Sequence, residues 1–194
     1  MTLLYGLGNN ETKYLKTKHN AGRIVLELLA QKMDLVLQKK NGFWFAKYHR
    51  GDHDLLLVYS DGYMNTSGQP LADFCSYFKL KPDRLLVLQD DSDQMVNSQK
   101  LSIGGGTAGH NGIISVYQYC ESFGIKRDNV LRLKIGIRPE GNRLKSETFV
   151  LSSISQTEQS HYQKIADELY KNLSLIESDS IPILQNIFNS DLAN

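Results

Sequence analysis

The chain has 194 residues, of which 22 are Lys or Arg and 21 are Asp or Glu, so its formal net charge is +1. This length is typical of one domain with a sizeable core, and a composition of 41% hydrophobic and 22% charged residues excludes a disordered chain. The balanced charge excludes a nucleic-acid binder that relies on a strongly basic composition, although it leaves room for a local basic patch.

Hydrophobic periodicity in the first half of the chain predicts strands and one helix. Residues 2–9 are typical of a short buried strand that runs into a turn. Asn20 is placed to cap a helix that continues to about Leu37. Two strands over residues 43–49 and 54–60 form a predicted hairpin.

The second half continues this alternation of helices and strands. The pattern predicts a helix over 71–80, an apolar strand over 84–89, a short strand over 101–103, a helix over about 113–123 and a strand over 129–137. Two amphipathic helices are predicted from residue 156 onward. The sequence therefore predicts the α/β class: a single domain over residues 1–194, with a mixed twisted sheet flanked by helices and a helical tail over about 156–194.

The two cysteines and the N-terminus bear on the compartment. Cys75 and Cys120 lie far apart in apolar surroundings, which predicts buried thiols in a reducing compartment. The N-terminus lacks the pattern of a signal peptide, and no apolar run approaches the roughly 18 residues of a membrane span. We therefore expect a cytoplasmic protein without a membrane segment.

Charge is distributed unevenly along the chain. Residues 1–150 carry 20 basic and 15 acidic side chains, whereas residues 151–194 carry 2 and 6. Either a solvated acidic tail follows a mildly basic body, or a basic face binds an anionic ligand. Composition alone leaves both interpretations open.

Several common sites are disfavoured by the motifs. Residues 104–109 formally match a dinucleotide-binding glycine pattern, but the strand before them is short and polar-flanked, so an oxidoreductase is a weak interpretation. No nucleotide-binding P-loop and no serine-hydrolase elbow occurs. The five histidines do not have the spacing of metal ligands. We expect neither a cofactor nor a metal.

Polar residues follow three predicted strands. Asn9, Asn65 and Asp90 stand at such strand ends, where ligands bind in open α/β sheets. His19 and Asn111 stand next to predicted helix starts. One histidine, one carboxylate and several amides are thus predicted to converge. Each residue alone also has a structural interpretation, in a turn or a helix cap, so this pattern leaves the function open.

Six short motifs contain these polar residues and occur in a characteristic order. In chain order they are GLGN (6–9), KHNAG (18–22), YMNTSG (63–68), LQDDSD (88–93), GGGTAGHNG (104–112) and LRLKIGIRP (131–139). Their order and spacing resemble the bacterial-type peptidyl-tRNA hydrolase family. The resemblance implies a monomeric, metal-free α/β enzyme that hydrolyses the ester between a peptide and the terminal ribose of tRNA, and so recycles peptidyl-tRNA from stalled ribosomes. It implies no obligate protein partner.

The resemblance also implies roles for individual residues. His19 corresponds to the general base that activates water, and Asp90 to its partner. Asn9, Asn65 and Asn111 correspond to amides that hold the substrate, with Asn9 as the discriminator against unblocked aminoacyl-tRNA. Further candidates for substrate or tRNA binding are Tyr14, Asn20, Tyr63 and Met64. Candidate phosphate contacts are Lys100, Arg132, Lys134 and Arg138.

Two departures from the family pattern accompany these matches. Asn10 and Glu11 stand where the family has Pro and Gly, which changes the turn beside Asn9. Only Lys100 remains of the basic residues that usually precede the glycine-rich loop. The alternative to an enzyme is a non-catalytic RNA-binding relative, against which the presence of His19 and Asp90 argues.

Overall fold

The computed structural model describes residues 1–141, 145–178 and 180–192. A sheet of seven strands, in the order β2-β3-β4-β1-β5-β7-β6, forms its centre. The strands are β1 (Thr2–Gly6), β2 (Gln38–Lys40), β3 (Phe43–Arg50), β4 (His53–Ser60), β5 (Arg84–Met95), β6 (Gln99–Ile103) and β7 (Leu131–Arg138). β4, β1, β5 and β7 run parallel, whereas β2, β3 and β6 pair antiparallel, so the sheet is mixed as expected.

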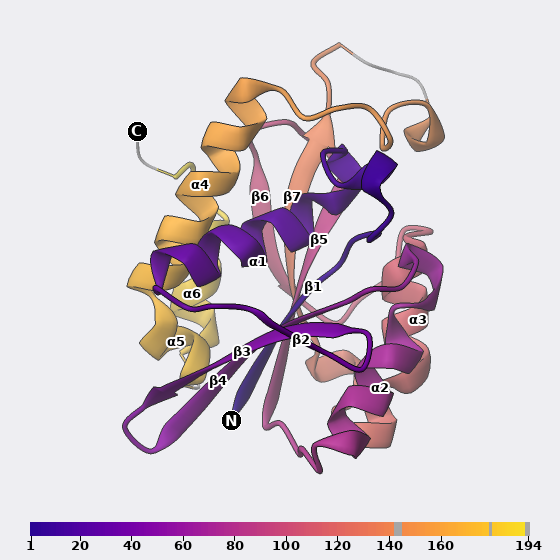
Figure 1. Cartoon of the computed structure of the whole chain (residues 1–194). Coiled ribbons are helices and arrows are strands. Elements are labelled where there is room, and N and C mark those ends of the chain that lie inside the picture. Colours follow the sequence, from indigo (N-terminus) through magenta and orange to yellow (C-terminus); the bar gives the residue numbers. More distant parts are fainter. Residues whose placement is uncertain (142–144, 179, 193–194) are drawn as a thin grey trace.

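Helices cover both faces of the sheet (Figure 1). On one face lie α1 (Ala21–Lys32), α4 (Gln156–Lys171), α5 (Leu173–Glu177) and α6 (Ile181–Phe188). On the other lie α2 (Gly68–Tyr77) and α3 (Asn111–Tyr119). Alternate strand residues supply the two cores: in β1, Leu4 packs on the first face, and Leu3 and Tyr5 pack on the second.

The tail belongs to the core. Leu184 and Phe188 of α6 are fully buried. The Gln99 side chain donates to the Phe188 carbonyl at 3.0 Å, and the Leu101 N–H donates to Asn189 Oδ1 at 2.8 Å. The tail thereby covers the hydrogen-bonding edge of β6, which would otherwise be open to another chain.

Several element boundaries differ from the sequence prediction. β5 does not end before Asp90, because Asp90 and Asp91 continue to pair with β7. α1 ends at Lys32, and the polar strand β2 that follows lacks the alternation that predicts strands. The tail contains a third helix, α5. Within the described residues no helix is long and apolar enough to cross a membrane.

Candidate active site

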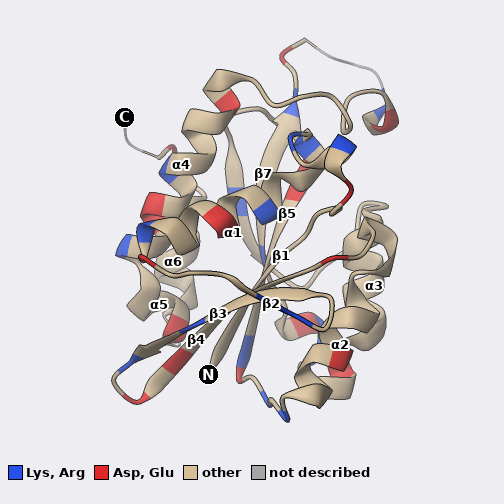
Figure 2. Cartoon of the chain, viewed as in Figure 1, with Lys and Arg blue, Asp and Glu red and all other residues tan. Residues whose placement is uncertain are grey.

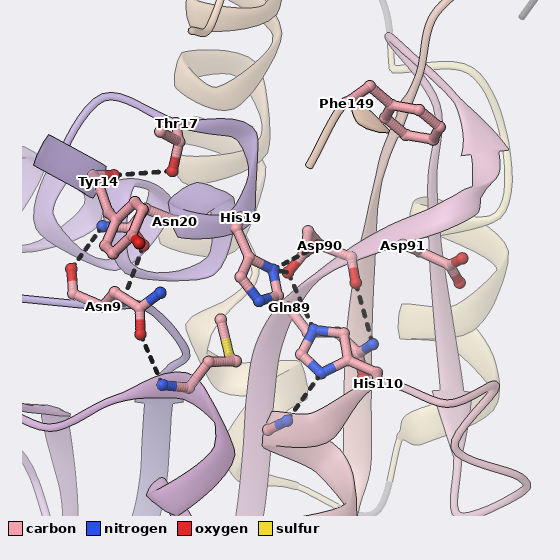
Figure 3. Close-up of polar contacts among 12 residues, drawn as sticks. Asn9, Tyr14, Thr17, His19, Asn20, Gln89, Asp90, Asp91, His110 and Phe149 are labelled. Carbon is pink, nitrogen blue, oxygen red and sulfur yellow. Dashed lines mark hydrogen bonds and ion pairs between the residues drawn. The ribbon is translucent and has the colours of Figure 1, made fainter. Parts of the chain in front are cut away.

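Two histidines converge on one carboxylate near the carboxyl ends of the parallel strands (Figure 3). Asp90 lies on β5 and is 2% exposed. His19, in the 3-10 turn Lys18–Asn20 before α1, places its Nδ1 3.0 Å from both carboxylate oxygens. His110, just before α3, places its Nε2 2.9 Å from Asp90 Oδ1. The prediction that His19 and Asp90 come together is confirmed, and His110 joins them.

The hydrogen bonds of His110 determine its tautomer. Its Nδ1 accepts the backbone N–H groups of Gly112 and Ile113, at 3.1 and 3.4 Å, and so caps α3. A nitrogen that accepts carries no hydrogen, so Nε2 carries it and donates to Asp90. His110 is therefore held as a neutral ring at the positive end of the helix dipole.

The surroundings of Asp90 hold it as a carboxylate. Burial alone disfavours its charge, but its interactions with His110 and His19, hydrogen bonds included, outweigh burial and keep the pKa of Asp90 well below its usual range. Since Asp90 is ionised, it accepts at both contacts, and His19 donates to it from Nδ1. The second nitrogen of His19, Nε2, lies on the side of the ring away from Asp90 (Figure 3).

The same contact tunes His19. Desolvation lowers the pKa of the imidazole, but attraction to Asp90 and the hydrogen bond with it raise the pKa more, so it lies above the ordinary value of 6.5. A position before a helix N-terminus would by itself favour the neutral ring. Here the buried carboxylate is the stronger influence.

The backbone around His19 is held by two distant segments. The N–H of His19 donates to the Val150 carbonyl at 2.8 Å, and that of Lys18 donates to the Ser152 carbonyl at 3.0 Å. Gly22, at the start of α1, lies against β5, where an added Cβ would be 2.0 Å from the Leu88 carbonyl oxygen. The close approach of α1 to β5 places His19 within reach of Asp90.

Asn9 is a donor in this site. Its Oδ1 accepts the Met64 N–H at 2.6 Å, so the amide hydrogens on Nδ2 remain for a ligand. In Figure 3 this nitrogen points to the side on which His19 lies. Met64 lies close to the start of α3. A Cβ added to Gly112 would be 2.6 Å from the Met64 sulfur and 3.1 Å from His110 Cε1, so both side chains pack against this glycine.

Asn20 has a different role from the expected one. Its side chain donates to the Asn9 carbonyl and accepts the Asn9 N–H, both at 2.8 Å, and it does not cap α1. It is 0% exposed, and both of its hydrogen bonds go to the backbone of Asn9. Asn20 braces the Asn9 turn, which argues against the predicted direct contact with a substrate.

The unusual turn after Asn9 is held by side chains. Asn10 accepts from Arg23 Nη1 at 2.6 Å and donates to Asp61 Oδ1 at 2.7 Å. Trp44 Nε1 donates to the same Asp61 oxygen at 2.8 Å. The turn is thus tied to α1 and β4 without the proline that the family has there.

A cavity of about 180 Å³ adjoins the histidines. Its lining includes His19, Asp90 and Asn111, together with Thr107 and Val150. Asn65 and Tyr63 are exposed, and neither lines this cavity. Tyr14 is half-buried, and the ammonium of Lys13 lies 4.6 Å from its ring centroid. The structure thus brings Asn111 beside His19 and Asp90, while Asn65 and Tyr63 lie outside the cavity.

The predicted phosphate contacts divide into two groups. Lys134 pairs with Asp91 at 3.2 Å, Arg138 pairs with Asp93 at 3.7 Å, and Lys100 is exposed. Lys100 stands opposite Lys134 in the β6–β7 register, so the two share one face. Arg132 contributes to the cavity lining but is 1% exposed and bonded within the protein, which argues against the predicted phosphate contact.

The trio of His19, Asp90 and His110 deserves comparison with a metal site, because one ligand atom from each lies within 4.8 Å of the others. Such a set is of the type that binds zinc. Metal binding through His110 Nε2 would require its hydrogen to move to Nδ1, which would break the cap of α3. The geometry favours a hydrogen-bonded network, and the absence of a metal requirement stays a prediction.

His110 and Gln89 are site residues that the sequence reasoning missed. Gln89 is buried and its amide donates to the Asp90 carbonyl at 3.1 Å. The position of His110 directly before a predicted helix was the available signal, since an N-cap with a side-chain acceptor has a fixed orientation. Nothing local in the sequence identifies the other partner of Gln89, Arg132, whose Nε donates to Gln89 Oε1.

Known proteins match the chain over almost its whole length. The family model for peptidyl-tRNA hydrolase matches residues 3–194. The peptidyl-tRNA hydrolase of Haemophilus influenzae is 31% identical over 191 residues, which cover 97% of this chain and 96% of that protein. The one from Lactobacillus johnsonii is 34% identical over 184 residues, 93% of each.

A solved structure agrees with these sequence matches. Peptidyl-tRNA hydrolase from Acinetobacter baumannii has a TM-score of 0.84 at 29% identity, and the match covers 99% of this chain and 96% of that one. The resemblance predicted from the six motifs is confirmed, and the chain belongs to the peptidyl-tRNA hydrolase family.

Proposed function

We propose that this protein hydrolyses the ester bond between a peptide and the terminal ribose of tRNA. The observation that carries the proposal is the ionised Asp90, held between His19 and a neutral His110 beside a cavity. The matched relatives carry the name of the same activity, which supports this substrate class.

His19 is the general base in this proposal. Because Nδ1 donates to Asp90, the lone pair of Nε2 is available to take a proton from water as the water oxygen attacks the ester carbonyl carbon. Asp90 holds the tautomer and stabilises the imidazolium that forms. When the bond from carbon to the ribose oxygen breaks, the imidazolium returns the proton to that oxygen. The products are a free carboxylic acid and a tRNA hydroxyl.

Asn9 supplies the preference for a blocked amino group. With Oδ1 engaged by Met64, it offers only N–H groups, which bind a carbonyl oxygen of the peptide. The α-ammonium of unblocked aminoacyl-tRNA offers only hydrogens in return, so it leaves that donor unpaired. Asn111, in the cavity wall, is the candidate to donate to the oxyanion that develops as water attacks the ester carbonyl, since the N–H groups of Gly112 and Ile113 are used by His110.

The direct test compares two tRNA substrates. Purified protein with N-acetyl-aminoacyl-tRNA should release the N-acetyl amino acid, with EDTA present and without added nucleotide. Unblocked aminoacyl-tRNA should be hydrolysed much more slowly. Equal rates on the two substrates would refute the role of the blocked amino group. Binding of tRNA without hydrolysis would favour the non-catalytic RNA-binding alternative, and a dependence on metal would refute the proton network as the complete catalyst.

The remaining expectations concern partners and place. We infer that peptidyl-tRNA is the partner and that the protein works as a monomer in the cytoplasm, without an obligate protein partner. The contacts of the β6 edge with the tail support the monomer, since they cover this edge. Light scattering at enzyme concentrations used in the assay would test it, and a dimer mass would contradict it.

A further inference from the structure

Arg132 is a buried cation in β7 with no obvious task in the reaction. It is among the largest fully buried side chains, and no carboxylate within the described residues pairs with it. Its Nε donates to Gln89 Oε1 at 2.8 Å, and its Nη1 donates to the carbonyls of Gly106 at 2.7 Å and Gly104 at 3.2 Å. Nη1 also lies 3.4 Å from the Tyr117 hydroxyl. Burying a charged group is energetically costly, and hydrogen bonds such as these offset that cost.

The carbonyls that Arg132 binds belong to the glycine-rich loop, residues 104–110. Gly104, Gly105 and Gly109 have positive φ angles, as does Ala108, so the loop follows a path that few residues adopt freely. Glycines lose the most conformational freedom on folding, so an ordered loop of this composition requires tethers. The N–H of Gly104 bonds to the Val130 carbonyl, and Arg132 adds two bonds to the first half of the loop.

The same loop ends at His110, whose Nε2 donates to Asp90. The other partner of Arg132, Gln89, precedes Asp90 on β5 and donates to its carbonyl. One guanidinium therefore joins the strand that carries Asp90 to the loop that carries His110. Arg132 thus connects Gln89, which hydrogen-bonds to the Asp90 carbonyl, with the loop whose His110 hydrogen-bonds to the Asp90 carboxylate.

We propose that Arg132 is a positioning residue, which holds the glycine-rich loop against β5 so that His110 donates its Nε2 hydrogen to Asp90. The inference rests on the proposed ester hydrolysis for its kinetic readout. It assigns to Arg132 a task different from a phosphate contact. By placing the His110 donor on Asp90, Arg132 also affects how strongly the carboxylate attracts the proton of His19, and hence the pKa of His19.

The key variant is Arg132→Met, which removes every donor but keeps much of the volume. We expect kcat on N-acetyl-aminoacyl-tRNA to fall by about 10- to 100-fold with little change in KM, because a misplaced loop costs rate and not tRNA affinity. Without the His110 donor, the charge of Asp90 acts more strongly on His19 and raises its pKa. The midpoint of the acidic limb of the pH–rate profile should therefore rise. Arg127→Met is the matched control, since Arg127 also lies over the Tyr117 ring, at 4.8 Å, but belongs to a surface turn.

A double-mutant cycle identifies the route of the effect. His110→Ala should shift the midpoint in the same direction, and adding Arg132→Met to it should change kcat little further, because the two residues act in one chain of contacts. Fully additive losses would overturn the proposal. An unchanged kcat with a weaker salt dependence of tRNA binding would also overturn it, and would restore the phosphate-contact role.

Two further measurements keep the test decisive. If Arg132→Met does not fold, Arg132→Lys retains the charge and one set of donors, and an intermediate loss of kcat with the same midpoint shift is expected. Nitrogen NMR of the imidazole rings reports the tautomer directly and needs no activity. The wild type should show His110 protonated at Nε2 only, and the folded Arg132 variant should show a mixture of tautomers. A wild-type pattern in that variant would contradict the proposal even if the proposed function failed.

Discussion

Asp90 accepts hydrogen bonds from two imidazole rings, and within the described part of the chain no Lys or Arg forms an ion pair with it. The two rings are not equivalent, because His110 is fixed as a donor by its cap on α3, whereas His19 has a free nitrogen. Only His19 can exchange a proton with water without breaking a helix cap. At the scale of single residues, the division of labour between the histidines follows from which ring nitrogen is already in use.

Asp90→Asn tests this division through pH. In the wild type the pKa of His19 lies above 6.5, so the rate falls as pH drops through that raised value and the base takes up a proton. Without the carboxylate, desolvation dominates and the pKa of His19 falls, so the midpoint of the acidic limb should move to lower pH. The plateau rate should also drop, by about 10²- to 10⁴-fold. A profile of kcat/KM from about pH 5 to 8 measures both effects.

Asp93→Asn is the matched control for that profile, since it changes a carboxylate of the same strand that is 69% exposed. It should leave the midpoint and the plateau unchanged. A midpoint in Asp90→Asn equal to the wild-type value would refute Asp90 as the partner of His19.

At the scale of elements, the close approach of α1 to β5 positions the base. Gly22→Ala would place a Cβ 2.0 Å from the Leu88 oxygen and 2.5 Å from its carbon, and backbone cannot yield as a side chain does. We expect the free energy of unfolding to fall by about 1–3 kcal/mol or more, and kcat to fall as His19 moves from Asp90. Urea unfolding and the blocked-substrate assay measure these two effects.

Gly62→Ala provides the comparison, because no atom lies closer than 3.4 Å to a Cβ at that position. The free energy of unfolding of Gly62→Ala should be close to that of the wild type. If Gly22→Ala were equally stable and active, the tight contact of α1 with β5 would not be what sets the position of His19.

The elements also show what local sequence can predict. The apolar runs of β1 and β4 and the spacing of Val25, Leu26 and Leu29 in α1 made those elements predictable. β2 has no apolar residue, and β5 continues through buried aspartates whose pairing with β7 is a long-range contact. Likewise, the motifs identified His19 and Asp90 as site residues. The roles of Gln89, His110 and Arg132 could not be predicted in this way, because their partners lie far along the chain.

Across the whole molecule basic and acidic residues are interspersed, and both kinds occur on α1 and on α4 (Figure 2). The acidic tail packs on the face with α1, whereas the register of β6 with β7 places Lys100 and Lys134 on the opposite face. Lys134 is partly neutralised by Asp91. A net charge of +1 is therefore compatible with a small basic surface next to the site. Contacts with a few phosphates orient a tRNA without the tight binding that a strongly basic protein would have.

Salt dependence of tRNA binding tests that surface. Log K should fall linearly with log of the salt concentration, and Lys100→Gln should reduce the slope by about 1 if it contacts one phosphate. Lys126→Gln, in an exposed turn beyond the glycine-rich loop, is the comparison and should leave the slope unchanged. A slope that is insensitive to Lys100 would place the phosphate contacts elsewhere.

In the proposed reaction His19 removes a proton from water as the water oxygen attacks the ester carbonyl carbon of peptidyl-tRNA. The most direct measurement of this step is the single-turnover hydrolysis of N-acetyl-aminoacyl-tRNA by wild type and His19→Ala at saturating enzyme, with urea unfolding to show that both are folded. We expect release by the wild type and a loss of about 10²- to 10⁴-fold in the variant, with tRNA affinity retained. A folded His19→Ala that hydrolyses the substrate at a rate near that of the wild type would contradict the proposed role of His19.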